Sequence, residues 1–249
     1  GYGVASGAAS LGPSLVAFDD HPGQLYRVWH VVSRGWAPWA WNPGWWAGYP
    51  ELQFYPPGFA YAAAILHHAT LGALSVPASY QIGVWIAYLA PGITAWLALT
   101  RLLGDGWLAL PGAFVALTLA AGVASGVEGG VRWGMVPARL GWALLPLLVL
   151  IVAGWRERPR RARAAATVLL VAIVLLHPAH LPTAVCIVAL SALTGGRARM
   201  RDGVLALAVA ALATAFWTLP LLARLDEPPA PPGGRLSASV GAPQPPPLG

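Results

Sequence analysis

Two adjacent carboxylates, Asp19 and Asp20, precede Arg27 in a chain that is otherwise strongly apolar. A carboxylate can take a proton from a hydroxyl group or coordinate a divalent cation. A planar guanidinium can pair with a phosphate. On a helix, Asp20, Gln24 and Arg27 share one face. We therefore expect Asp20 and Asp19 to be catalytic, Gln24 and Arg27 to bind substrate, and Asp20 to bind any metal; Mg²⁺ or Mn²⁺ is the only cofactor expected.

Each of these residues also has a purely structural interpretation. Either aspartate fits the N-cap of a helix over 20–33, since Pro22 suits a first turn. Arg27 fits an interfacial arginine that neutralises lipid headgroups. Capping and catalysis do not exclude each other, so both interpretations stay open.

A dense set of aromatic and amide side chains follows, between Trp36 and Tyr55. It forms either an aromatic belt at the membrane surface or a surface on which sugar rings and an isoprenoid chain stack. Interleaved glycines and prolines predict a non-helical path, which is tolerated at membrane depth only where protein covers it or it lines a wet cavity. The substrate-binding candidates here are Asn42, Trp46, Tyr49, Gln53 and Tyr55.

Three more candidates for substrate binding lie further along the chain. Glu128 and Arg132 belong to a Gly-rich segment that is either part of the same site or a solvated loop. His177 and His180 flank a turn between two apolar runs, where polar residues are costly and thus functional suspects; the alternative is a capping role. Two histidines alone make a poor metal site, so no zinc is expected.

The composition predicts the class of protein that must position these groups. Hydrophobic residues are 57% and charged residues 10% of 249, and the mean hydropathy is +0.61. A soluble domain needs about a quarter charged residues, so we predict a polytopic membrane protein. The formal charge is +6, but the arginines cluster in runs between apolar segments. Membrane topology explains those runs better than nucleic-acid binding, and no nucleic-acid partner is expected.

Apolar stretches of about 20 residues predict membrane spans. Two shorter runs, 164–176 and 181–193, predict a helical hairpin or one broken helix. The predicted spans lie near 80–100, 107–125, 137–154 and 203–222.

The arginine runs at 156–163 and 197–201 should be cytoplasmic. Counting back through the spans places the Asp-rich loop outside. The apolar stretch at 57–74 is then expected to lie along the outer interface or dip into it rather than cross the membrane. The expected fold is an all-α polytopic transmembrane helical bundle with an extracytoplasmic first loop carrying interfacial helices. Its expected parts are the remnant of a first helix at 1–18, the loop at 19–79, the bundle at 80–222 and a Pro-rich extracytoplasmic tail at 223–249.

Three motifs carry a resemblance to a known family: Asp-His-Pro-Gly-Gln-Leu-Tyr-Arg at 20–27, Trp-Asn-Pro-Gly-Trp-Trp-Ala-Gly-Tyr-Pro at 41–50 and Phe-Tyr-Pro-Pro at 54–57. They resemble the first extracytoplasmic loop of GT-C-type membrane glycosyltransferases. More narrowly, they are similar to the bacterial branch labelled 6-pyruvoyl-tetrahydropterin-synthase-related membrane proteins, neighbours of the YfhO-like group; that label implies no pterin chemistry. Leu-His-Pro at 176–178 and Phe-Trp-Thr-Leu-Pro at 216–220 are similar to later landmarks of the family.

The resemblance implies transfer of a sugar from a polyprenyl-phosphate donor, in a bacterial plasma membrane, with a loop carboxylate as base or metal ligand. By position, Asp20 matches the family aspartate better than Asp19. The expected partners are this donor and membrane lipids. The chain is short for a complete enzyme of this type and is expected to be a fragment. Two rival hypotheses remain: a non-enzymatic membrane protein that handles lipid or polymer, and a transporter with a midplane site.

Overall fold

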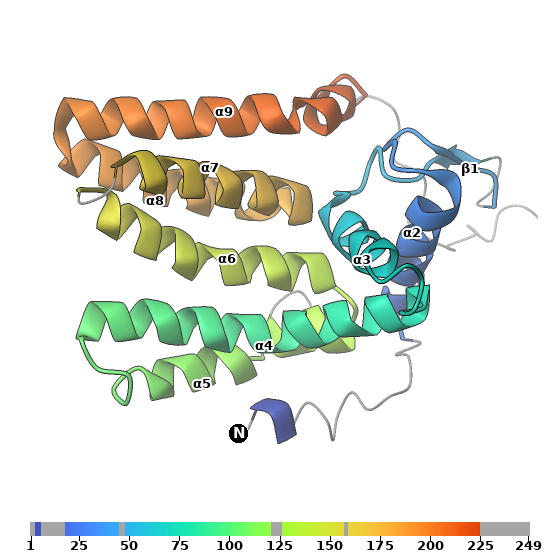
Figure 1. The fold of residues 1–249 in the computed structure, drawn as a ribbon, viewed down its shortest axis with the longest axis horizontal. Coiled ribbons are helices and arrows are strands. Elements are labelled where there is room, and N and C mark those ends of the chain that lie inside the picture. The colour runs from blue at the N-terminus through green and yellow to red at the C-terminus, as the bar shows by residue number, and fades with distance from the viewer. Residues whose placement is uncertain (1–2, 6–17, 45–47, 121–125, 157–158, 225–249) are drawn as a thin grey trace, which may run out of the picture.

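The computed structural model describes residues 3–5, 18–44, 48–120, 126–156 and 159–224 (Figure 1). These residues are overwhelmingly helical, as the composition predicts. Three expectations fall wholly or mostly outside this described part: Trp46, the helix remnant at 1–18 and the tail at 223–249.

The helices follow one another with short connections, and one pair of two-residue strands interrupts them. The strands pair antiparallel, with Trp41 opposite Pro50 and Asn42 opposite Tyr49. The elements are α2 (His21–Arg34), β1 (Trp41–Asn42), β2 (Tyr49–Pro50), α3 (Gly58–Ala69), α4 (Val76–Leu103), α5 (Leu110–Thr118), η1 (Glu128–Arg132), α6 (Val136–Ala153), η2 (Gly154–Arg156), α7 (Pro159–Leu176), η3 (Pro178–His180), α8 (Leu181–Thr194) and α9 (Gly196–Leu222).

Helices α4 to α9 lie side by side as an elongated bundle, and α2 and α3 pack together at one end of it (Figure 1). We call this the loop end. Successive helices of the bundle alternate in direction, so α4 starts at the loop end while α7 and α9 start at the opposite end. That opposite end is called the arginine end below.

Within the described part of the chain, three helical segments are long and apolar enough to cross a membrane: Val76–Leu103, Val136–Arg156 and Gly196–Leu222. Their presence indicates a membrane protein. They match three of the four predicted spans. Ser75 starts the first of them as an N-cap, because its side chain accepts a hydrogen bond from the amide of Ala78.

The fourth predicted span, at 107–125, is not found within the described residues. The helix there, α5, has nine residues and at 1.5 Å per residue extends about 14 Å, roughly half the hydrocarbon thickness. It ends where Leu119 turns to an extended conformation, φ −55° and ψ 120°. Apolarity alone predicted a span that the backbone cuts short.

The stretch at 57–74 forms α3, whose 12 residues are also too few to cross a bilayer alone. A helix of this length agrees with the expectation that the stretch is not a span, and its place at the outer interface stays a prediction. Phe59, Ala60, Ala63 and Ala64 form its buried face, at the spacing of one helical stripe, and α3 packs against α2 and α4.

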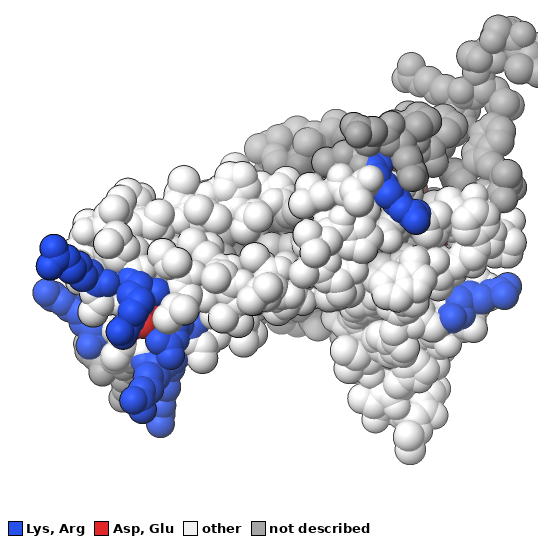
Figure 2. Space-filling view, turned by 90° about the horizontal axis from the view of Figure 1, so that it is seen from above, with Lys and Arg blue, Asp and Glu red and all other residues white. Residues whose placement is uncertain are grey.

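Arginine side chains gather at the arginine end (Figure 2). They come from η2, the start of α7 and the start of α9, where the sequence places both arginine runs. Among the described residues there, the carboxylate of Asp202, 6% exposed, pairs with Arg163 at 2.7 Å. The two short apolar runs form α7 and α8, joined by η3, which confirms the predicted hairpin.

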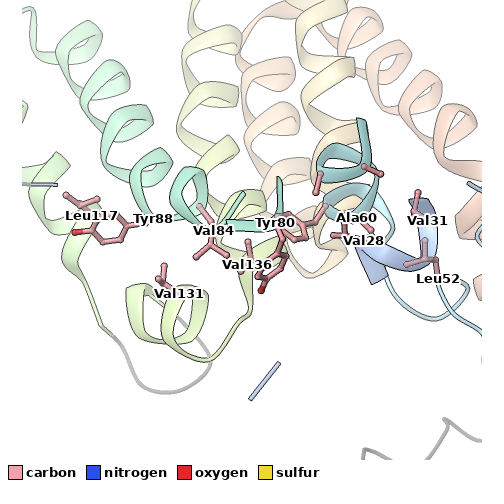
Figure 3. Close-up of a cluster of buried hydrophobic side chains, with 14 residues drawn as sticks. Val28, Val31, Leu52, Ala60, Tyr80, Val84, Tyr88, Leu117, Val131 and Val136 are labelled. Atoms are coloured by element: carbon pink, nitrogen blue, oxygen red, sulfur yellow. The ribbon is translucent and has the colours of Figure 1, made fainter. Parts of the chain in front are cut away.

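A hydrophobic cluster at the loop end ties α2 and α3 to the start of α4 (Figure 3). Val28, Tyr80 and Val84 are each at most 1% exposed within it. Full burial of one such side chain stabilises a fold by roughly 1.5–3 kcal/mol. The polar residues of α2 are consequently held on a rigid support.

Candidate functional site

Asp20 occupies the N-cap position of α2, but its side chain caps nothing. Its backbone is helical, with φ −74° and ψ −15°, and no side-chain hydrogen bond to the helix amides forms. A capping residue ordinarily has an extended backbone that aims its side chain at those amides. The capping interpretation of Asp20 is thus wrong. Its exposed carboxylate remains available to bind a ligand or take a proton.

The backbone around Asp20 is fixed by the segment between η1 and α6. The Asp20 amide donates a hydrogen bond to the carbonyl of Trp133, at 3.1 Å. Gly134, with φ +86°, fits against Asp20 so closely that a Cβ there would lie 2.6 Å from the His21 amide nitrogen. Only glycine suits this combination of left-handed backbone and close approach.

The pKa of Asp20 is raised above its ordinary value. Partial desolvation is the main cause and repulsion from Asp19 the second, while attraction to Arg27 opposes both. Asp19 itself has a left-handed backbone, φ 51°, which is uncommon for a residue with a side chain. A carboxyl group with a raised pKa is a stronger base, which suits proton abstraction.

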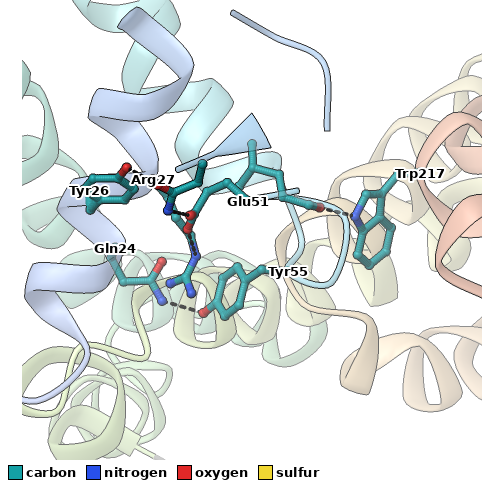
Figure 4. Close-up of polar contacts among 8 residues, drawn as sticks. Gln24, Tyr26, Arg27, Glu51, Tyr55 and Trp217 are labelled. Atoms are coloured by element: carbon teal, nitrogen blue, oxygen red, sulfur yellow. Dashed lines mark hydrogen bonds and ion pairs between the residues drawn. The ribbon is translucent and has the colours of Figure 1, made fainter. Parts of the chain in front are cut away.

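The predicted polar face of α2 is present and faces the segment at 51–55 (Figure 4). The amide of Gln24 donates a hydrogen bond to the Tyr55 hydroxyl, and the Arg27 guanidinium lies over the Tyr55 ring, 3.8 Å from its centre. Nε of Arg27 also pairs with Oε1 of Glu51, at 3.4 Å. Two substrate-binding candidates of α2 therefore meet a third, Tyr55.

A second chain of contacts holds Asn42. Its Oδ1 accepts hydrogen bonds from the Tyr26 hydroxyl, at 2.6 Å, and from the Gly44 amide, at 2.8 Å. Its Nδ2 donates to Oε2 of Glu51, at 2.5 Å. Glu51 is 2% exposed and thus joins Asn42 to Arg27, so these polar groups form one buried network. Tyr49 lies beside that network, and its pKa is raised by burial and by its hydrogen bond to the Glu51 carboxylate.

Gln53 is buried, at 1% exposure, and its Nε2 has no hydrogen-bond partner among the described residues. A buried donor without a partner costs about 1–3 kcal/mol. Among the amide candidates it is the one whose side-chain nitrogen donates no hydrogen bond to the described residues.

His21 was not a candidate from sequence, yet it is fully buried beside Asp20 and uses both ring nitrogens. Nε2 lies 2.7 Å from the carbonyl of Val131, and Nδ1 lies 2.6 Å from the Tyr80 hydroxyl. A carbonyl only accepts, so Nε2 carries the proton and Nδ1 accepts from Tyr80. Burial lowers the pKa of His21, consistent with this neutral form.

Of the three remaining candidates, two adjoin the Asp20 region. Glu128 and Arg132 pair with each other at 3.2 Å across one helical turn of η1, and Arg132 lies over the ring of Phe18, 6.0 Å from its centre. His177 stands beside His180, with ring centres 5.3 Å apart, and no contact joins it to α2 among the described residues.

The loop is also tied to the far end of the chain. The indole Nε1 of Trp217 donates a 2.8 Å hydrogen bond to the carbonyl of Leu52 (Figure 4). Both residues are buried. The Phe-Trp-Thr-Leu-Pro motif thus supports the loop rather than standing apart from it.

The described residues contain no group of three or more His, Cys, Asp or Glu side chains that could hold a metal ion. Asp19 and Asp20 are the acidic pair available at the loop end. Mg²⁺ is commonly held by one or two carboxylates together with substrate phosphates. This pair fits a site of that kind and not one built from protein ligands alone.

Comparison with known proteins gives no support for a family. No family model, no curated protein and no solved structure matches this chain. The GT-C resemblance therefore remains a prediction from the three loop motifs.

The sequence interpretation missed several residues on which the site depends. Tyr26 holds Asn42, and Glu51 pairs with Arg27. His21 ties the start of α2 to Val131 and Tyr80. Glu51 was visible as an acid among aromatic residues, a signal that could have marked it. Tyr26 and His21 carried no such signal, because their partners lie on separate segments.

Proposed function

We propose that the protein is a GT-C-type membrane glycosyltransferase that moves a sugar from a polyprenyl-phosphate donor to an extracytoplasmic acceptor. The observation that carries the proposal is the Asp20 carboxylate, which is exposed, caps nothing and has a raised pKa. It starts the helical face that continues through Gln24 to Arg27. A base and a phosphate-binding cation on one rigid helix are what such a transfer needs.

In the proposed reaction, Asp20 takes the proton of the acceptor hydroxyl as that oxygen attacks the anomeric carbon. The bond between this carbon and the phosphate oxygen of the donor breaks, and the electron pair leaves with the polyprenyl phosphate. Arg27, with Arg132 as a second cation, stabilises the leaving phosphate. A divalent cation held by Asp19 and Asp20 would add positive charge at the same phosphate.

The proposed membrane orientation follows from charge. Arginine-rich connections are typical of the cytoplasmic side, and they lie at the arginine end. The loop end with Asp20 then faces outward, in a bacterial plasma membrane, where lipid-linked sugar donors are used. Tyr49, Tyr55 and the neighbouring tryptophans would frame the sugar and the prenyl chain.

A non-enzymatic role in lipid or polymer handling is the second candidate, and one observation favours it. Gln24, Asn42 and Arg27 are already engaged with Tyr55, Tyr26 and Glu51. Polar groups that are already paired with one another need no substrate to pair with. The two candidates differ in whether the Asp20 carboxylate is required.

The test uses the protein purified in mild detergent and supplied with a panel of polyprenyl-phosphate hexoses. We expect wild type to release free polyprenyl phosphate, measured by mass spectrometry. Asp20→Asn should abolish release while the protein still unfolds cooperatively, at or above the wild-type temperature. Arg27→Gln should weaken retention of polyprenyl phosphate in native mass spectra, whereas Arg34→Gln, an exposed arginine on the same helix, should not. Undiminished release by Asp20→Asn would end the enzymatic proposal.

A further inference from the structure

A second cationic site lies on α6, away from the residues discussed so far. Arg139 is 5% exposed, although it belongs to one of the three segments able to span a membrane. No carboxylate of the described residues pairs with it, since the ion pairs found there involve other arginines. A buried charge without a counter-charge is costly in an apolar environment.

Two backbone carbonyls offset part of that cost. Nε of Arg139 donates to the carbonyl of Ala87, at 3.0 Å, and Nη2 donates to that of Leu117, at 2.8 Å. The first carbonyl is free because Pro91, four residues on within α4, has no amide hydrogen. The second belongs to the last turn of α5, where carbonyls lack helical partners.

The guanidinium still has donors to spare. It carries five N–H groups, and Nη1 donates no hydrogen bond to the described residues. Arg139 also lines a partly open cavity of about 140 Å³, together with Trp142 and His180. A cavity of about 150 Å³ can hold a benzene-sized molecule, so this one has room for a phosphate group.

The depth of the site favours a headgroup over a midplane ligand. Arg139 is in the first turn of α6, at the loop end of a segment of 21 residues. Lipid phosphates lie at the ends of spanning helices, outside the hydrocarbon core. Gly130 is also packed against the side chain so closely that a Cβ would lie 2.4 Å from Cδ of Arg139, which restricts how the arginine can be placed.

We infer that Arg139 and this cavity form a binding site for a phosphate group, supplied by an anionic phospholipid. A bound phosphate would accept hydrogen bonds from Nη1 and neutralise the buried charge, while the two carbonyls keep the guanidinium in place. The site does not depend on the proposed glycosyl transfer, because Arg139 contacts none of the residues assigned to that reaction among the described residues.

The first experiment places the full chain in nanodiscs of phosphatidylcholine with increasing phosphatidylglycerol, and counts bound phosphatidylglycerol by native mass spectrometry. We expect one tightly held lipid in wild type, and an apparent affinity weaker by about tenfold or more in Arg139→Gln, in line with loss of charged hydrogen bonds. Arg34→Gln loses the same charge at the same end of the molecule and should match wild type. Equal binding by wild type and Arg139→Gln would overturn the inference.

A second variant tests the site without changing Arg139, in case Arg139→Gln fails to fold. Ala116→Leu fills the cavity from α5, where Ala116 lines it, and leaves the guanidinium intact. It should lose the lipid and keep the wild-type unfolding temperature in pure phosphatidylcholine, whereas Ala153→Leu, at an exposed position, should retain the lipid. Retention by Ala116→Leu would exclude the cavity as the site.

The source of the phosphate is tested with inorganic phosphate in phosphatidylcholine nanodiscs. A rise in unfolding temperature with phosphatidylglycerol but not with inorganic phosphate supports the lipid source. A rise with inorganic phosphate that Arg139→Gln abolishes would keep the site but reject the lipid. Because Arg27→Gln should leave this lipid bound, failure here and failure of the proposed transfer remain distinguishable.

Discussion

Trp217 and Leu52 lie 165 positions apart in the chain, yet the indole of one donates a 2.8 Å hydrogen bond to the backbone carbonyl of the other. Trp217 is 1% exposed and Leu52 is fully buried. The contact joins the C-terminal part of α9 to the segment that carries Glu51, Gln53 and Tyr55. The candidate site is therefore held in place by α9 as well as by the helices next to it in the sequence.

Trp217→Phe keeps an aromatic ring but removes the indole N–H and some buried volume, and it leaves the Leu52 carbonyl without its donor. We expect the free energy of unfolding to fall by about 1–3 kcal/mol, the cost of a buried unsatisfied group. Hydrogen exchange should also accelerate at the Leu52 and Gln53 amides. Thermal unfolding and exchange mass spectrometry in one detergent measure both effects.

Trp96→Phe is the matched control. Its indole also donates to a carbonyl, that of Gly106 at 3.0 Å, but the contact is exposed. Water can replace the lost donor there, so we expect a loss below about 0.5 kcal/mol. Similar losses in the two variants would show that burial of the Leu52 carbonyl has no special role.

Arg27→Gln should destabilise the loop because it leaves the Glu51 carboxylate buried without its cation. Breaking a fully buried pair costs about 3–5 kcal/mol. The Arg27 side chain is 20% exposed, so we expect about 2 kcal/mol after allowance for solvent screening. Chemical denaturation of the two proteins in the same detergent gives the difference.

The double variant Arg27→Gln with Glu51→Gln tests the cause. Removing both charges should recover part of the stability lost in Arg27→Gln, since no charge is then left alone. Strictly additive losses would mean that the two side chains are not energetically coupled.

His21 should make the protein sensitive to acid. Its pKa is lowered by burial, so between that lowered value and the ordinary value of 6.5 the unfolded chain binds more protons than the folded one. The contribution of neutral His21 to stability is therefore fully present above pH 6.5 and is lost as the pH falls below it. Unfolding temperatures measured across this range should decline in wild type.

His21→Gln removes the titrating group and should flatten part of that decline. The residual slope is expected to come from His30, whose pKa is also lowered by burial. An unchanged slope in His21→Gln would show that the ring is not neutral in the folded protein.

Asp20 should change the pH dependence of stability in the opposite direction from His21. Because its pKa is raised, the folded protein holds a proton more tightly than the unfolded chain between the ordinary value of 3.8 and the raised one. Stability should fall as the pH rises through that window, and Asp20→Asn should remove this component. Unfolding curves at successive pH values, with Asp105→Asn as a comparison, would detect it; a slope that is the same in Asp20→Asn contradicts the raised pKa.

Local patterns predicted the helical elements well. Periodicity placed Asp20, Gln24 and Arg27 on one face of α2, and that face is present, because helical spacing is a local property. Length and apolarity found three of the spanning segments. They failed at α5, where the helix stops at Thr118 although the sequence stays apolar. Apolarity indicates that a segment avoids water but does not determine where its helix ends.

The contacts that complete the site were beyond such patterns. Tyr26 meets Asn42 only because β1 folds back on β2, and His21 meets Tyr80 only because α4 passes beside α2. Arg139 was hidden inside a predicted span, since its two carbonyl partners lie 52 and 22 positions away. Pairings at such distances depend on the complete path of the chain.

The contact between Arg139 and the carbonyl freed by Pro91 also bears on how the protein is made. Helix α6 follows α4 and α5 in the chain, so both acceptors exist before the arginine arrives. An arginine at the start of a helix enters a bilayer at a lower cost when acceptors are waiting. We therefore expect α6 to insert more readily when α4 and α5 precede it than when they are absent.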